Sequence, residues 1–299
     1  GLVGDFQDGV VFGQHAMAYE LGVYAVQYFR LRLAQERRHV QSLVRLKGRP
    51  AMTRDGVAIK LYANIDVPED IETSLVAGAD GIGLYRTEFL FLNRADLPGE
   101  EEQFQVYRNL LAGFPAKPVV IRTLDLGADK LPRLWCDEST LKECGALGMR
   151  AIRVCLHWPE LFRTQLRALL RAAPYGKMRL LFPMLTTLDE ARQCLQWIAK
   201  IKEELNATHI EVACGGMIEV PGAALMAASF ARQLHFLSVG TNDLVQYTLA
   251  TNRGHGNVAY LYDKAHTAVM RLLSHVISAD ERVVVLWSGG GEWEDVAWD

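Results

Sequence analysis

Residues 180–239 of the sequence read LLFPMLTTLDEARQCLQWIAKIKEELNATHIEVACGGMIEVPGAALMAASFARQLHFLSV. Short apolar runs alternate here with longer segments whose apolar residues recur at a helical spacing. The runs are residues 180–184, 211–218 and 236–239, and the helical segments between them are residues 188–205 and 223–234. A strand, a helix and another strand in regular succession predict parallel strands joined by crossover helices.

The same alternation extends on both sides of this stretch, beginning after Pro50. Further predicted strands are residues 57–65, 81–85, 119–123, 149–154 and 283–286, and further predicted helices are residues 101–111, 161–172 and 265–276. Eight strands in about 230 residues match the scale of a (β/α)8 barrel, which has about 250 residues. We therefore expect an α/β fold of the TIM-barrel type, incomplete at its eighth unit. A doubly wound open sheet is the alternative, but no Gly-x-Gly-x-x-Gly follows the first predicted strand to support it.

Composition limits the classes of partner. The chain has 299 residues, with Lys+Arg 32, Asp+Glu 35 and a net charge of -3. No overall basic field is present, so we expect neither a nucleic acid nor an anionic membrane as partner. No apolar run reaches the ~18 residues of a membrane span. The five cysteines are scattered and never spaced Cys-x-x-Cys, which argues against a disulfide framework or a zinc site and predicts a cytoplasmic protein.

The organisation of the chain is predicted in three parts. Residues 1–28 give no usable pattern and stay unassigned, whereas residues 29–50 mix basic and apolar residues at a helical spacing and predict a charged linker helix. The alternative for that segment is a basic arm that binds nucleic acid. Residues 51–299 form the predicted barrel, with an atypical C-terminal end. Because the chain opens Gly-Leu-Val without an initiator Met or a leader, we expect a piece of a longer protein or a processed product.

Charged side chains gather where the predicted strands end, which is the active-site face of such a barrel. Taken singly, each arginine could belong to a surface ion pair of small value. Together the cations fit phosphate and carboxylate oxygens, and two carboxylates at neighbouring strand ends fit a divalent ion such as Mg2+. The cations are Arg86, Arg122, Lys130, Arg150 and Arg253, and the carboxylates are Glu219 and Asp243. A carboxylated phosphate ester would satisfy both halves of this site.

Two stretches carry a family resemblance. Residues 79–89 (ADGIGLYRTEF) and 237–247 (LSVGTNDLVQY) resemble the phosphoenolpyruvate-binding barrel of enzyme I of the bacterial sugar phosphotransferase system. Residues 120–130 (VIRTLDLGADK), 216–221 (GMIEVP) and 261–263 (LYD) extend the match to about residues 45–280. Nitrogen-related enzyme I and the multiphosphoryl transfer proteins look at least as similar.

The resemblance implies a role for each residue of the charged cluster. Arg86, Arg122 and Arg253 would hold the phosphate and carboxylate of phosphoenolpyruvate, with Lys130 and Arg150 assisting. Glu219 and Asp243 would ligate Mg2+, and Asn242 would contact the phosphate. The family passes the phosphoryl group to a histidine on a separate swivelling domain and then to a small phosphocarrier protein, and it dimerises through this barrel.

The sequence also departs from the family pattern. The family's last strand leads into a Cys-Gly-Glu turn, whereas residues 287–292 read WSGGGE, so no cysteine is found and Ser288 stands nearest its place. None of the eight histidines has the family's Thr-Ser-His context. These departures, with an ending that suggests a truncation or frameshift, leave a catalytically silent fragment or binding module as an alternative. A relative of pyruvate phosphate dikinase or phosphoenolpyruvate synthase is a further alternative.

Overall fold

The computed structural model describes residues 28, 30–31, 33–35, 38, 49–92, 94–131, 145–252, 258–279 and 283–286. The chain divides into two compact units, Gly1–Ile59 and Lys60–Asp299. In the first unit, the described positions from 28 to 38 are helical and exposed, and β1 (Ala51–Met52) pairs antiparallel with β2 (Ala58–Ile59). Residues 49–50 are described and are not helical. The rest of the predicted linker helix lies outside the described residues, and so do residues 1–27.

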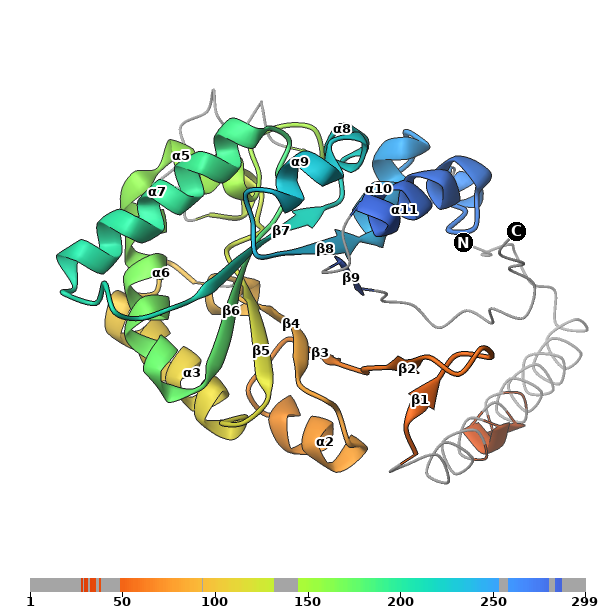
Figure 1. Cartoon of the computed structure of the whole chain (residues 1–299), viewed down its shortest axis with the longest axis horizontal. Coiled ribbons are helices and arrows are strands. Elements are labelled where there is room, and N and C mark those ends of the chain that lie inside the picture. The colour runs from red at the N-terminus through yellow and green to blue at the C-terminus, as the bar shows by residue number, and fades with distance from the viewer. Residues whose placement is uncertain are drawn as a thin grey trace, which may run out of the picture. The chain divides into compact units, whose positions relative to one another are not determined.

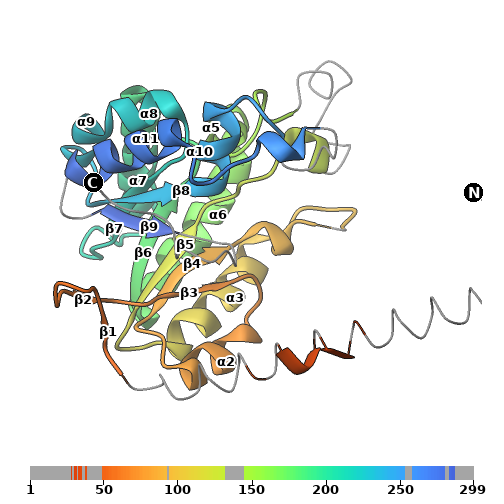
Figure 2. The same cartoon turned by 90° about the vertical axis from the view of Figure 1, so that its right-hand side faces the viewer.

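The second unit is built on one parallel sheet of seven strands, each paired with its neighbours in sequence. They are β3 (Ala63–Ile65), β4 (Ile82–Arg86), β5 (Pro118–Arg122), β6 (Lys177–Phe182), β7 (Ala213–Ile218), β8 (Phe236–Gly240) and β9 (Val283–Leu286). Figures 1 and 2 show the sheet curling from β3 to β9. Within the described residues, β3 and β9 each pair on one side only. The α/β barrel-type fold is therefore confirmed, as a curled sheet that is open between its first and last strands.

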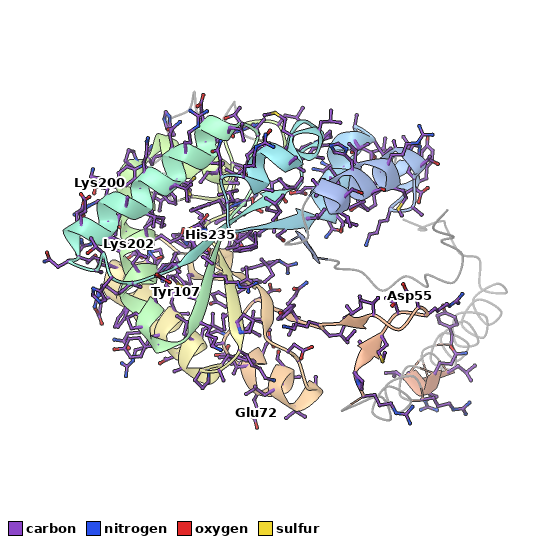
Figure 3. All side chains as sticks on the ribbon, viewed as in Figure 1. Asp55, Glu72, Tyr107, Lys200, Lys202 and His235 are labelled. Carbon is purple, nitrogen blue, oxygen red and sulfur yellow. The ribbon has the colours of Figure 1, made fainter. Side chains whose placement is uncertain are left out.

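The helices lie in an outer row around this curled sheet (Figure 1). Tyr107, labelled in Figure 3, is fully buried on α3, whereas Lys200 lies on the exposed side of α7. The helix α7 begins at a capping box, because the Thr187 side chain accepts from the Glu190 main-chain N–H and Glu190 reaches back to Thr187. The helices are α2 (Asp70–Ala77), α3 (Glu100–Gly113), α5 (Ile152–His157), α6 (Pro159–Ala172), α7 (Leu188–Glu204), α8 (Pro221–Leu225), α9 (Ala227–Ala231), α10 (Thr241–Thr248) and α11 (Thr267–Ala279). Single 3-10 turns follow β4 (Glu88–Leu90) and β5 (Ala128–Lys130), and others are Ala173–Tyr175 and Ala259–Leu261.

The two faces of the sheet carry separate apolar clusters. The large cluster lies between the sheet and the outer helices. The small one fills the concave side and consists of Leu84, Val120, Leu181, Met217 and Phe236. Because side chains alternate between faces along a strand, a residue two positions beyond a member of the small cluster faces the same way. Arg86, Arg122 and Glu219 occupy those positions, so charge replaces apolar packing where β4, β5 and β7 end.

Three element predictions were wrong in detail. Residues 149–154 do not form a strand: Ala151 has a φ of 55°, and the helix α5 begins at Ile152. Its buried residues Ile152 and Cys155 are one helical turn apart, a spacing that a run of six residues does not distinguish from a buried strand. The run 57–65 holds two strands, β2 and β3, and the segment 223–234 holds two helices that are interrupted at Met226.

Two further findings bear on the predictions from composition. No helix within the described residues is both long enough and apolar enough to cross a bilayer. Cys155, Cys194 and Cys214 are free and buried, and the other two cysteines lie outside the described residues. Burial raises the pKa of the Cys214 thiol to about 11.

Candidate functional site

A cavity of about 400 Å3 opens at the carboxyl ends of the strands in the second unit. Its floor includes Leu84 and Met217 of the small apolar cluster, and its wall is strongly charged. Three arginines and four carboxylates line it, namely Arg86, Arg122, Arg150, Glu88, Asp125, Glu219 and Asp243. Asn64, Phe89, Gly240, Thr241 and Asn242 complete the lining. The fold therefore brings charged groups from five segments of the chain to one cavity.

Arg122, the last residue of β5, is buried beneath two carboxylates. Its Nη1 lies 2.8 Å from Asp125 Oδ2 and its Nη2 lies 3.2 Å from Glu88 Oε1. Although burial acts in the opposite direction, Asp125 and Glu88 raise the pKa of the guanidinium, so it stays charged. Its Nε and Glu88 Oε2 are both buried, and neither has a hydrogen-bond partner among the described residues. Such orphaned groups are costly in a protein interior, and a polar ligand in the cavity is one way to satisfy them.

Arg150 lines the same cavity. The segment before α5 pairs with the chain after β5, through an isolated bridge between Gly127 and Arg150. This pairing brings the Arg150 side chain back over the strand ends, where its Nη2 contacts Asp125 Oδ1 at 2.9 Å and Asp243 Oδ2 at 3.0 Å. Its Nη1 donates to the Tyr247 hydroxyl at 3.2 Å. Burial opposes the charge of Arg150, but Asp125 and Asp243 outweigh it and raise the pKa.

Glu219 follows β7 and is almost fully buried. One oxygen, Oε1, accepts from the Met184 main-chain N–H at 2.6 Å, and the other lies against Gly240. A Cβ at position 240 would come within 2.5 Å of Glu219 Oε2, so only glycine leaves room for the carboxylate here. Burial raises the pKa of Glu219 well above its usual value, and the charges of Asp125 and Asp243 raise it further.

The donor chemistry at this edge fits Mg2+. No group of three or more His, Cys, Asp or Glu within the described residues is arranged to hold a metal. Mg2+, however, is commonly held by one or two carboxylates, with substrate oxygens and water completing its shell. Glu219 and Asp243 both line the cavity, and their mutual repulsion with Asp125 is what a divalent cation would relieve.

Arg86 and Asn242 are held at the rim of the cavity. Arg86 Nη1 lies 2.8 Å from Asp66 Oδ1, just beyond the end of β3, and both side chains are partly exposed. Asn242 stands in the first turn of α10, where the Tyr262 hydroxyl lies 3.0 Å from its main-chain oxygen and 3.2 Å from its Oδ1. These contacts fix both side chains from outside the cavity.

The comparison of sequences identifies the family. Residues 40–292 match the family described as PEP-utilising enzyme, PEP-binding domain, where PEP is phosphoenolpyruvate. The chain belongs to this family. Relatives of the PEP-binding domain include the phosphoenolpyruvate-protein phosphotransferase of Bacillus sp. (strain S), 50% identical over 237 residues that cover 77% of this chain and 40% of the relative. The phosphoenolpyruvate-protein phosphotransferase of Cupriavidus necator is 47% identical, and the match covers 85% of this chain and 45% of the relative.

A third relative agrees with these two. The phosphoenolpyruvate-protein phosphotransferase of Priestia megaterium is 42% identical and covers 92% of this chain and 49% of the relative. The PEP-binding domain thus spans less than half the length of these relatives. Among solved structures, an HpcH/HpaI aldolase/citrate lyase family protein from Burkholderia cenocepacia is 15% identical with a TM-score of 0.45, covering 76% of this chain and 79% of that one.

Of the site residues predicted from the sequence, six line the cavity of this PEP-binding domain. They are Arg86, Arg122, Arg150, Glu219, Asn242 and Asp243. Lys130 is described but does not line it: its side chain is 61% exposed and its Nζ lies 3.0 Å from Asp129. Arg253 and Ser288 lie outside the described residues.

Two acidic residues of the site were missed as candidates. Asp125 and Glu88 occur in the quoted motifs but received no role from the sequence. A signal was available, since each lies a few residues from a strand-end arginine, and a buried cation needs a carboxylate partner. Glu88 also accepts from the Asp125 main-chain N–H at 2.9 Å, so the two residues tie the ends of β4 and β5 together.

Proposed function

We propose that this chain is the phosphoenolpyruvate-binding barrel of a phosphoenolpyruvate-protein phosphotransferase of the enzyme I type. The observation that carries the proposal is the convergence of Arg86, Arg122 and Arg150 on one cavity beside the Glu219 and Asp243 carboxylates. Forked guanidinium groups suit the oxygens of a phosphate and a carboxylate. The names of the relatives supply the substrate and favour this activity over the dikinase and synthase alternatives.

In this proposal, Arg86, Arg122 and Arg150 bind the phosphate and carboxylate of the substrate. Asn242 offers a further phosphate contact, Arg253 joins the arginines that hold the substrate, and Lys130 assists them. Phosphoryl transfer asks a protein mainly to position the reacting groups and to neutralise charge on the transferring oxygens. The buried guanidinium groups suit that task, because their charges are fixed before the substrate arrives.

Mg2+ would be held by Glu219 and Asp243 and would supply charge neutralisation on the phosphate oxygens. The balance of charge supports this part of the proposal. Three arginines face four carboxylates around the cavity, so the described lining offers no excess of positive charge to a multiply charged anion. A divalent cation would shift that balance in favour of binding.

The acceptor is proposed to be a histidine on a separate domain. Neither His nor Cys is among the described residues that line the cavity, and in the family that this chain resembles the acceptor histidine belongs to a separate swivelling domain. The phosphoryl group would pass from that histidine to a small phosphocarrier protein. We also propose, from the family resemblance, a homodimer and a cytoplasmic location.

Calorimetric titration of the 299-residue chain tests binding. We expect phosphoenolpyruvate to bind in the presence of Mg2+ and to bind at least tenfold more weakly in its absence. Arg192 forms an exposed ion pair with Asp189 outside the cavity, so the control variant Arg192→Gln is expected to bind phosphoenolpyruvate as the parent chain does. No binding by a chain that circular dichroism shows to be folded would contradict the proposal.

A second assay tests transfer itself. The chain is mixed with a separately produced swivelling domain of an enzyme I, labelled phosphoenolpyruvate and Mg2+, and phosphohistidine is measured. Label on the histidine supports the phosphotransferase. Binding without transfer would support the silent binding module.

A further inference from the structure

The Asp125 carboxylate contacts two of the three arginines that line the cavity. Its side chain is 5% exposed, and each of its oxygens contacts a different arginine. Oδ2 lies 2.8 Å from Arg122 Nη1, and Oδ1 lies 2.9 Å from Arg150 Nη2. One carboxylate thus bridges two guanidinium groups that reach the cavity from β5 and from the segment before α5.

Hydrogen bonds also hold the backbone around Asp125. Its main-chain N–H donates to Glu88 Oε1, and the preceding N–H, of Leu124, donates to Gln165 Oε1 at 3.0 Å. Gln165 is buried in α6 and also donates from Nε2 to Thr87 Oγ1 at 3.2 Å. Hydrogen bonds therefore link the backbone that carries this carboxylate to the end of β4 and to α6.

Arg150 has a second carboxylate partner, and the two partners differ in their proposed duties. The same Nη2 atom contacts Asp125 and Asp243. Asp243 is a proposed ligand of the divalent cation, whereas Asp125 faces two arginines. Asp125 is thus the partner that holds Arg150 in place independently of Asp243.

We propose that Asp125 is a positioning residue that sets Arg122 and Arg150 as a fixed pair for the anionic groups of the substrate. This inference rests on the proposed function, because it assigns Asp125 a duty in binding phosphoenolpyruvate. The carboxylate accepts a hydrogen bond from Arg150, forms an ion pair with Arg122 and offsets the repulsion between the two guanidinium groups. It acts through the arginines and does not touch the substrate.

A double-mutant cycle tests the proposal, with the dissociation constant of phosphoenolpyruvate at fixed Mg2+ as the readout. Asp125→Asn is expected to weaken binding at least tenfold. In an Arg150→Gln background the same substitution is expected to cost at most about threefold, because the arginine pair that Asp125 positions is already broken. In an Arg86→Gln background it is expected to keep its full effect, since Arg86 pairs with Asp66 instead.

The two backgrounds separate positioning from a general loss of structure. A structural defect would act equally with Arg150→Gln and with Arg86→Gln, and that outcome would overturn the proposal. Asp189→Asn, which removes a carboxylate from the exposed pair with Arg192, is the surface control and is expected to leave binding unchanged.

Asp125→Glu covers the case in which Asp125→Asn does not fold. It keeps the buried negative charge but moves the carboxylate by one methylene, so we expect a folded protein that binds phosphoenolpyruvate at least fivefold more weakly. Binding equal to the parent chain would overturn the proposal. Failure of the parent chain itself to bind would count against the proposed function, and is thereby distinguished from failure of this inference.

Discussion

Arg86 and Arg122 are register partners at the carboxyl ends of β4 and β5. Neighbouring strands lie about 4.8 Å apart, so two like charges that face each other across a strand pair repel. Each arginine has its own carboxylate: Asp66 lies 2.8 Å from Arg86, and Asp125 lies 2.8 Å from Arg122. The carboxylates therefore offset the repulsion between the two cations at the end of the sheet, so both arginines are in place before an anion binds.

Arg122→Lys tests the need for a forked cation. Lysine keeps the charge but lacks the planar fork whose two terminal nitrogens contact Glu88 and Asp125 separately. Because a hydrogen bond to a charged group is worth about 1.5–3 kcal/mol, we expect phosphoenolpyruvate to bind roughly 10- to 100-fold more weakly. Calorimetry measures the change, and Arg192→Lys provides the exposed control. Unchanged affinity in Arg122→Lys would remove Arg122 from the binding site.

Gly240→Ala tests the close approach of Glu219 to β8. The new methyl group would displace the Glu219 carboxylate, because its Cβ would come within 2.5 Å of Oε2. We expect a loss of about 1–3 kcal/mol in the free energy of unfolding and at least tenfold weaker Mg2+-dependent binding. The matched control is Gly222→Ala, since nothing lies within 4 Å of a Cβ at position 222. Equal behaviour of the two variants would show that the packing at Gly240 does not matter.

Glu219→Gln tests the proposed metal ligand. In the parent chain, Mg2+ at about 100 times its dissociation constant would stabilise the fold by about 2.7 kcal/mol, a rise in melting temperature on the order of 5–10 °C. The variant is expected to lose this rise. Without metal, its melting temperature should equal or exceed that of the parent, because one charge leaves the cluster formed with Asp125 and Asp243. Thermal unfolding with and without Mg2+ measures both effects.

The control for the metal experiment is Glu160→Gln, which removes an exposed carboxylate from α6. It should respond to Mg2+ as the parent chain does. A full response in Glu219→Gln would mean that the cation binds elsewhere.

Glu100→Gln tests an ion-pair network between α3 and α6. Glu100 Oε2 lies 2.6 Å from Arg167 Nε, and Oε1 lies 2.8 Å from Arg171 Nη1. Burial alone would raise the pKa of Glu100, but hydrogen bonds from the two arginines lower it on balance. A depressed pKa in the folded state contributes stability above the unfolded value near 4.5, and this contribution is lost as pH falls through the folded value.

The measurement is the melting temperature between pH 7 and pH 3. The variant should melt below the parent at pH 7, and the difference should shrink below pH 4.5 as Glu100 is protonated in the parent. Glu160→Gln serves as control again, because its contact with Arg163 is 3.9 Å long and exposed. A difference that is constant with pH would show that the loss is one of packing alone.

The sequence by itself determined the class of the fold and five of the seven charged residues that line the cavity. Alternating strand and helix patterns predicted the parallel sheet, because these periods depend on local geometry that short segments carry by themselves. The predicted strands also placed Arg86, Arg122 and Glu219 at strand ends. The strand predicted at residues 149–154 was wrong, because a six-residue apolar segment fits a buried helix as well as a strand.

Only the tertiary structure decided which charges are partners. Asp125 meets Arg150 across 25 residues and Arg150 meets Asp243 across 93, and no sequence period links such distant positions. Their contacts depend on the bridge at Gly127, which turns the segment before α5 back over the strand ends. Local residues thus chose the strands and their faces, whereas long-range packing chose which carboxylate holds which arginine, because ion pairs form between whatever charges the fold brings within reach.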